Sequence, residues 1–158
     1  PIKFGRIDIR AKLPKGRGIW PALWMMPQED KFGGWPRSGE IDIMEFLGHE
    51  TNKVHATVHF GPGPGSTNIS RSTIGATPFS DAFHVYSLIW ETDRLRFLVD
   101  DVQFSEIKKA DLGSNNYPFN ESFFFIFNVA VGGNWPGNPD ATTYFPQWLI
   151  VDYVRVFQ

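Results

Sequence analysis

The chain has 158 residues, a length typical of one domain with a single core, and we assign residues 1–158 to one domain. Its 15 Lys and Arg residues nearly balance 17 Asp and Glu residues, which excludes the basic surface that nucleic-acid partners require. Cysteine is absent, which excludes disulfides and thiolate metal sites, and no apolar run approaches the ~20 residues of a membrane helix, so a membrane is not an expected partner.

The first third of the chain predicts two strands and a loop. Residues 4–13 alternate between apolar and charged side chains, which is typical of a half-buried strand. Residues 18–26 read as a second strand, and Pro21 should place it near a sheet edge or a bulge. On that strand Trp20 and Trp24 share one face. A loop over residues 27–39, rich in Gly, Pro and charge, carries Trp35.

The next stretch, residues 40–47, begins with alternating acidic and apolar residues. Strand side chains point to opposite faces with period two, so Glu40 and Asp42 share one face while Ile41 and Ile43 enter the core. Glu45 falls on the apolar parity, where a lone carboxylate would cost several kcal/mol. One extra residue near Ile43-Met44 would shift the phase, so we predict a β-bulge there that places all three acids in one row.

Three like charges in a row raise one another's pKa, so such a cluster retains a proton that ordinary surface carboxylates lose. One carboxylate that attacks and one carboxylic acid that protonates a leaving oxygen are the groups that glycoside hydrolysis requires. The alternative is a polar strand face bound to a cation or to water, because perturbed acids mark functional sites only statistically.

The rest of the chain predicts further strands and one long loop. The proposed strand over residues 53–60 places His55, Thr57 and His59 on one face, while residues 61–77 lack hydrophobic periodicity and read as a polar loop. His55 and His59 alone do not make a zinc site, because no third ligand has suitable spacing. Strands are also expected at 84–90, 94–100, 101–107, 123–131 and 149–157, of which 123–131 is apolar enough to be central. With 25 aromatic residues and 27 Gly or Pro residues, the chain is predicted to be an all-β sandwich or jelly roll.

The segment GEIDIMEFLG, preceded by WPRS, resembles the catalytic signature of glycoside hydrolase family sixteen. The six-residue ExDxxE spacing is similar to that of its laminarinase branch, the endo-β-1,3-glucanases, whereas lichenases more often have the shorter ExDxE. Further blocks that match the family in order are residues 4–14, 18–27, 52–62, 128–140 and 151–158. Collinear blocks are a stronger signal than one short motif.

This resemblance implies a jelly-roll β-sandwich of two antiparallel sheets with a concave substrate cleft. It also implies a retaining mechanism in which Glu40 is the nucleophile, Glu45 is the acid and then the base, and Asp42 holds Glu40 in place. The family's module normally begins before the equivalent of Pro1, so we expect its N-terminal strands to be missing here. A partial sequence, an associated N-terminal fragment or strand exchange between copies would each account for that.

Sugar rings stack on aromatic side chains, so the aromatic residues near the acids are candidate binding residues. Trp35 is the first candidate, because its loop leads to Glu40; its alternative is a core position. The other candidates are Trp20 and Trp24, Asn134 and Trp135 in the GGNWPG loop, and His55 and His59 beside the acids. Each of these has a structural alternative. No cofactor is expected for catalysis, but the family resemblance matches Asp152 to a residue that holds a structural calcium ion.

We therefore expect an endo-β-1,3-glucanase that acts on laminarin-type β-glucan, with an extracellular or periplasmic location by resemblance to the family. A mixed-linkage β-1,3-1,4-glucanase is the alternative enzyme. A non-catalytic β-glucan-binding module is disfavoured, because such homologues lose the catalytic glutamates and this chain has Glu40, Asp42 and Glu45. An inactive fragment is the third alternative.

Overall fold

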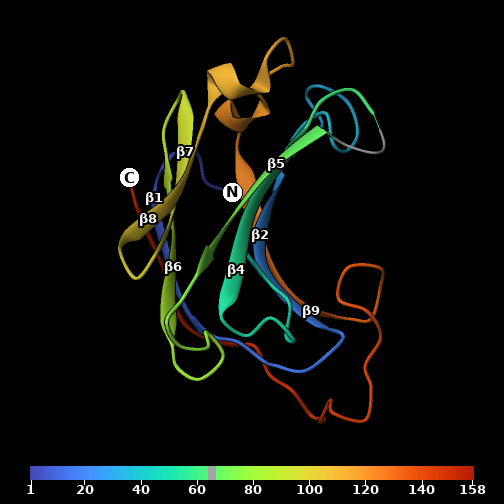
Figure 1. The fold of residues 1–158 in the computed structure, drawn as a ribbon. Coiled ribbons are helices and arrows are strands. Elements are labelled where there is room, and N and C mark those ends of the chain that lie inside the picture. The colour runs from blue at the N-terminus through green and yellow to red at the C-terminus, as the bar shows by residue number, and fades with distance from the viewer. Residues whose placement is uncertain (64–66) are drawn as a thin grey trace.

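A computed structural model describes residues 1–63 and 67–158 and shows two five-stranded antiparallel sheets packed face to face (Figure 1). The first sheet has the order β10 (Ile150–Phe157), β1 (Gly5–Lys12), β6 (His84–Trp90), β7 (Arg94–Val99), β8 (Val102–Lys108). The second has the order β5 (Thr67–Ile74), β4 (Lys53–Phe60), β3 (Glu40–Phe46), β2 (Ile19–Pro27), β9 (Phe123–Val131). The prediction of an all-β jelly roll is confirmed.

Two short 3₁₀ helices, η1 (Lys109–Leu112) and η2 (Pro118–Asn120), lie between β8 and β9 at one end of the sandwich (Figure 1). Across residues 1–63 and 67–158, no helix has the length and apolar character that crossing a bilayer requires.

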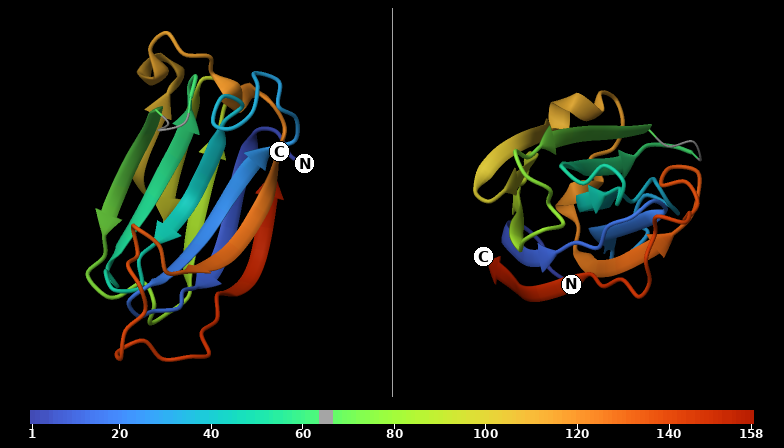
Figure 2. Two further views of the ribbon diagram at one scale, coloured as in Figure 1. Left: turned by 90° about the vertical axis from the view of Figure 1, so that its right-hand side faces the viewer. Right: turned by 60° about the horizontal axis from the view of Figure 1, so that its bottom comes forward.

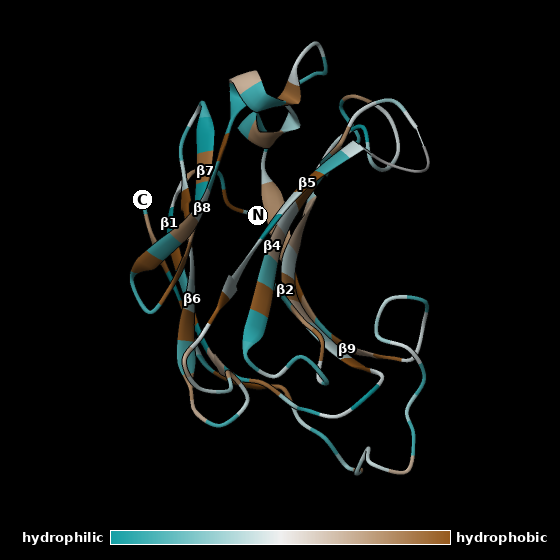
Figure 3. Ribbon diagram, viewed as in Figure 1, coloured by the Kyte–Doolittle hydropathy of each residue, from teal (hydrophilic) through white to brown (hydrophobic). Residues whose placement is uncertain are grey.

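The core lies between the sheets and follows from the period-two pattern of the strands. Along β4, Val54, Ala56 and Val58 are fully buried, while the residues between them face the other side, and Figure 3 shows this alternation of polar and apolar residues. On the facing sheet, Ile7 and Ile9 of β1 are equally buried. The outer face of the second sheet is thereby left for polar side chains, and the acids lie there.

The β-bulge predicted in β3 is confirmed. Against β4, Asp42 pairs with Thr57 and Glu45 pairs with His55, so two residues of β3 oppose one residue of β4. Ile43 and Met44 are both buried, and the extra residue returns Glu45 to the face that Asp42 occupies. The parity conflict in the sequence is therefore resolved by backbone geometry.

The long polar loop expected over residues 61–77 was wrong over much of its length. Residues Thr67–Ile74 form β5, which pairs with β4 at the outer edge of the sheet (Figure 2). Most of its Ser, Thr and Asn side chains are exposed and no residue of the strand is fully buried, so it has no hydrophobic periodicity. Residues 64–66 of the predicted loop lie outside the described residues.

One further strand placement was wrong. The apolar strand β9 is not central: it pairs with β2 and, at Phe123, with Ile2, and it ends the sheet order. Its apolar residues are divided between a part that packs on the core and an exposed part that includes Val131.

The prediction that Pro21 places β2 near an edge or a bulge is confirmed in its second form. The strand β2 is not at an edge, because Pro21 pairs with Val129 of β9. Its pairing with β3 begins at Ala22 and contains a bulge between Leu23 and Trp24.

Candidate active site

Glu40, Asp42 and Glu45 project from the outer face of the second sheet as a row along β3. The row lies beside β4, where Glu40 pairs with His59 and Glu45 pairs with His55. The backbone ladders on both sides of β3 hold the row in register, so the three carboxyl groups are placed by a rigid strand rather than by a loop. The predicted common face of the acids is confirmed.

Glu40, at the start of the row, is partly exposed and accepts a hydrogen bond from the indole Nε1 of Trp35. Trp35 is 47 % exposed, which rules out the alternative of a core tryptophan. Its ring lies 5.8 Å from the ring of His59, centroid to centroid. The loop before β3 therefore both orients the Glu40 carboxylate and presents an exposed aromatic ring beside it.

Asp42, in the middle of the row, is only 3 % exposed. Burial raises its pKa well above the usual range, and the charges of Glu45 and Glu40 and a hydrogen bond with Glu40 act in the same direction. Asp42 Oδ2 lies 3.3 Å from His59 Nε2, and burial lowers the pKa of His59 against the opposing charge of Glu40. Both pKa shifts favour the uncharged forms, a protonated Asp42 beside a neutral His59.

Glu45, at the end of the row, is 9 % exposed and accepts a hydrogen bond of 3.1 Å from the Thr57 hydroxyl. Burial raises its pKa to about 7, and the charge of Glu40 adds to this rise. The hydrogen bond from Thr57 and the nearby Trp20 indole favour the ionised form and lower the pKa. A carboxyl group with a pKa near 7 can donate a proton in one step and accept one in the next.

An aromatic cluster lies beside Glu45 and includes three of the predicted binding residues. Trp135 contacts Trp20 and His55 edge-on, with ring centroids 5.1 Å apart in both pairs. Burial lowers the pKa of His55, so it is neutral near pH 7. Trp135 remains 41 % exposed and thus presents an aromatic surface at the Glu45 end of the row, as Trp35 does at the Glu40 end.

Two other predicted binding residues are less engaged with the acids. Trp24 donates a 2.8 Å hydrogen bond from Nε1 to Asn128 of β9, and Asn134 is an exposed residue of the loop after β9. Sequence reasoning missed the contacts of Thr57 and Asn128. For Thr57 a signal was present, because the period of β4 places it between His55 and His59 on the face of the acids.

The part of the chain that the structure describes contains one group of three side chains that could hold a metal ion. Ligand atoms of Glu40, Asp42 and His59 all lie within 4.8 Å of one another. The hydrogen bond between Asp42 and Glu40 brings two of these three groups together.

Asp152, matched by resemblance to a calcium-binding residue, is ion-paired with Arg10 at 2.6 Å on the outside of the other sheet. A guanidinium group at that distance repels a cation, and a calcium ion requires six to eight oxygen ligands. The Asp152 carboxylate is thus paired with Arg10 in this structure, and calcium binding at Asp152 stays a prediction.

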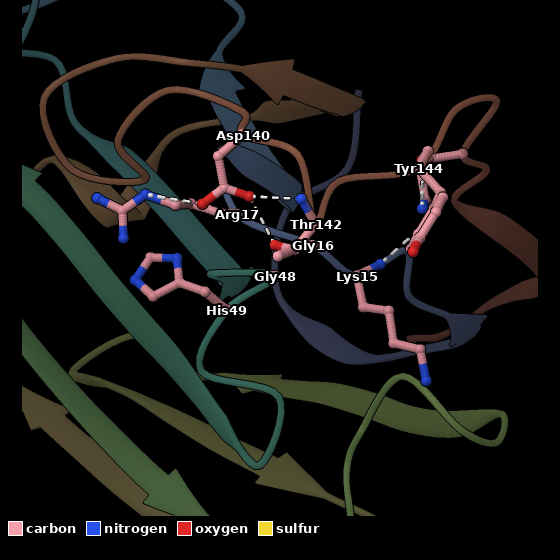
Figure 4. A pocket seen from close by; sticks show the side chains of 9 residues that line it. Lys15, Gly16, Arg17, Gly48, His49, Asp140, Thr142 and Tyr144 are labelled. Atoms are coloured by element: carbon pink, nitrogen blue, oxygen red, sulfur yellow. Dashed lines mark hydrogen bonds and ion pairs between the residues drawn. The ribbon is translucent and has the colours of Figure 1, made fainter.

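A pocket of about 520 Å³ lies where the loop after β9 meets the loops after β1 and β3 (Figure 4). Within it Asp140 accepts hydrogen bonds from the Thr142 amide and hydroxyl and lies 3.8 Å from Arg17. None of the predicted site residues lines this pocket, which is formed by Lys15, Gly16, Arg17, Gly48, His49, Asp140, Thr142, Tyr144 and Gln147. The carboxyl groups of Glu40, Asp42 and Glu45 lie on the open sheet face instead.

The raised pKa of Glu45 has a consequence for stability. Because its pKa rises from 4.5 to about 7 on folding, this group stabilises the fold below pH 4.5, and that contribution is lost as the pH rises through about 7. Glu45→Gln removes the titration. We expect the unfolding free energy of the variant, relative to wild type, to increase by about 2 to 3 kcal/mol between pH 5 and pH 8.

Urea denaturation of both proteins at the two pH values measures this difference. A stability difference that does not change with pH would show that Glu45 titrates normally in the folded protein. The exposed Glu29 serves as the matched control, since Glu29→Gln should leave the pH dependence of stability unchanged.

With the geometry established, comparison with known proteins identifies relatives. The family model "Glycosyl hydrolases family 16" matches residues 1–150. The chain is 41 % identical to glucan endo-1,3-beta-glucosidase A1 of Niallia circulans, over 99 % of this chain and 24 % of that protein. It is 40 % identical to a beta-glucanase of Rhodothermus marinus, over 98 % of this chain and 57 % of the relative.

Among solved structures, the laminarinase catalytic domain from Thermotoga maritima MSB8 superposes with a TM-score of 0.89 at 46 % identity. The match covers 98 % of this chain and 64 % of that domain. The chain thus spans less than two thirds of the length of each of these relatives.

Proposed function

The chain belongs to glycosyl hydrolase family 16, and on that basis we propose that it hydrolyses internal β-1,3-glucosidic linkages of laminarin-type β-glucans. The observation that carries this proposal is the row of Glu40, Asp42 and Glu45, in which each acid has a different environment. The names of the glucan endo-1,3-beta-glucosidase and laminarinase relatives support β-1,3-glucan as the substrate.

In the proposed mechanism Glu40 attacks the anomeric carbon while Glu45 protonates the departing glycosidic oxygen, so the bond to the leaving sugar breaks as the glycosyl–Glu40 ester forms. Glu45, now ionised, takes a proton from water, and the resulting hydroxide equivalent displaces Glu40 and retains the anomeric configuration. Asp42 keeps its proton and donates a hydrogen bond to Glu40. The chain's own side chains supply every group, so no cofactor enters the mechanism.

The substrate-binding residues follow from the two exposed rings. Trp35 lies beside Glu40, and Trp135, supported by Trp20 and His55, lies at the Glu45 end. Sugar rings stacked on these indoles would be held on either side of the scissile bond. His59 and Asn134 are proposed to contact sugar hydroxyls. Trp24 is proposed to contact the sugar through its ring, because its only donor is bound to Asn128. By resemblance to the family, we also propose an extracellular or periplasmic location.

Incubation of the protein with laminarin, lichenan and carboxymethyl-cellulose, followed by measurement of new reducing ends, tests the proposal. We expect reducing ends from laminarin, with short oligosaccharides appearing early because the attack is internal. Equal or faster release from lichenan would indicate a mixed-linkage glucanase. Binding to laminarin without any release would indicate a binding module and would contradict the catalytic role of the acid row.

A further inference from the structure

A second hydroxyl group adjoins the hydrogen bond between Thr57 and Glu45. Ser70 Oγ lies 3.0 Å from Thr57 Oγ1, which in turn lies 3.1 Å from Glu45 Oε2. Ser70 belongs to β5, the outermost strand of the sheet, and is the direct cross-strand neighbour of Thr57 on β4 (Figure 2). Hydrogen bonds thus link the three side chains across three adjacent strands, from Ser70 at the exposed edge to the buried Glu45.

The number of protons available decides which group donates in each of these two hydrogen bonds. A hydroxyl group carries one proton and two acceptor lone pairs. When Glu45 is ionised it can only accept, so the single proton of Thr57 points to Glu45 Oε2. The hydrogen bond between the two hydroxyls must then use the proton of Ser70, which donates to Thr57. Thr57 itself is only 5 % exposed.

On this basis we propose that Ser70 is a positioning residue for Glu45, acting through Thr57, so that the edge strand β5 helps to set the acid–base balance of the site. A donor that polarises the Thr57 hydroxyl strengthens its hydrogen bond to the carboxylate. The effect is larger for ionised Glu45 than for protonated Glu45, since hydrogen bonds to charged acceptors are the stronger ones. Ser70 therefore lowers the pKa of Glu45, which burial raises. The catalytic part of this inference rests on the proposed function.

The test is a pH titration of Glu45 in the Ser70→Ala variant. The titration is monitored by ¹³C NMR of the side-chain carboxyl groups. The Glu45 signal is assigned by its absence in Glu45→Gln. We expect the pKa of Glu45 to rise by about 0.3 to 0.5 pH unit in Ser70→Ala. The other titrating groups near Glu45 are Glu40 and Asp42 on β3 and His55 on β4, and this substitution leaves them in place.

Two further variants test whether the Ser70 hydroxyl acts through Thr57 or whether any substitution in β5 changes the pKa of Glu45. Ser70→Thr keeps the hydroxyl group and should return the titration to that of wild type. Ser72→Ala removes a hydroxyl two residues along the same face of β5, opposite His55 rather than Thr57, and should leave Glu45 unchanged. The inference is overturned if Ser70→Ala titrates as wild type does, or if Ser72→Ala shifts Glu45 as much as Ser70→Ala does.

Kinetics provide the second readout. Glu45 must be protonated for the first step, so kcat/KM falls as the pH rises through its pKa. In Ser70→Ala the falling limb should move to higher pH by the same amount as the NMR titration, with KM for laminarin unchanged at the optimum. Loss of hydrolysis in every variant and in wild type would refute the proposed function, whereas the NMR titration would still decide the role of Ser70.

Discussion

The Glu40→Gln variant should hydrolyse laminarin with a kcat/KM at least about 10⁴-fold below that of wild type. An amide oxygen is too weak a nucleophile to form the glycosyl ester. No neighbouring group is expected to replace it, because the raised pKa of Asp42 favours its protonated form and Glu45 must donate a proton. The fold should persist, since Glu40 is partly exposed and its hydrogen bond from Trp35 can be made to an amide oxygen. Reducing-end assays and circular dichroism measure the two results.

The matched control is Glu29→Gln, the same change at an exposed carboxylate of the preceding loop, which should leave kcat/KM unchanged. Glu40→Ala separates the nucleophile from a structural role. With an aryl β-glucoside substrate and added azide, the small anion can enter the space that the Glu40 side chain leaves. It attacks the face of the sugar that Glu40 would attack and displaces the aryl group with one inversion, which yields the α-glycosyl azide. Near-wild-type activity of Glu40→Gln, or a β-glycosyl azide from Glu40→Ala, would contradict the assignment of Glu40 as the nucleophile.

The position of the acid row could be predicted from the sequence because two simple constraints meet in β3. Side chains alternate with period two, and a buried carboxylate without a partner is costly. Only an extra residue satisfies both, and the structure has it between Asp42 and Glu45. The alternation of residues 4–13 and 53–60 predicted β1 and β4 for the same reason, because each strand has one buried face.

Prediction failed where a strand lacks such a contrast. The strand β5 has no buried face, so only its pairing with β4 makes it a strand, and pairing is not visible in a local sequence pattern. The strand β9 is apolar on both faces, which is typical of a central strand, yet the sheet order places it beyond β2. Sheet order depends on contacts between distant segments and so is not encoded in the composition of one strand.

The environment of each acid was also beyond the sequence. That Glu40 contacts Trp35 was expected from the short loop between them, but the Thr57–Glu45 hydrogen bond and the Asp42–His59 contact depend on the register of β3 against β4. The register shift at the bulge is what places Thr57 within reach of Glu45. The difference between a buried acid with a raised pKa and a partly exposed one therefore comes from tertiary structure.

The Glu45→Ala variant should show a loss that depends on the leaving group. On laminarin, whose departing sugar oxygen needs a proton, we expect kcat/KM to fall by roughly 10³-fold or more. With a dinitrophenyl β-glucoside, whose leaving group departs as an anion, glycosylation of Glu40 needs no acid and should stay within about tenfold of wild type. Hydrolysis of the glycosyl ester then becomes rate-limiting, because no base activates the water, so pre-steady-state measurements should show a burst of dinitrophenolate.

Azide should relieve that second step, because an anion needs no general base. It attacks the glycosyl–Glu40 ester from the face that Glu45 vacates, and two displacements yield the β-glycosyl azide, the opposite anomer to that expected from Glu40→Ala. The pair of variants therefore assigns the two glutamates by product stereochemistry, independently of how much activity each retains. An equal loss on laminarin and on the dinitrophenyl glucoside would show that Glu45 is not the general acid, and its raised pKa would then be a consequence of burial alone.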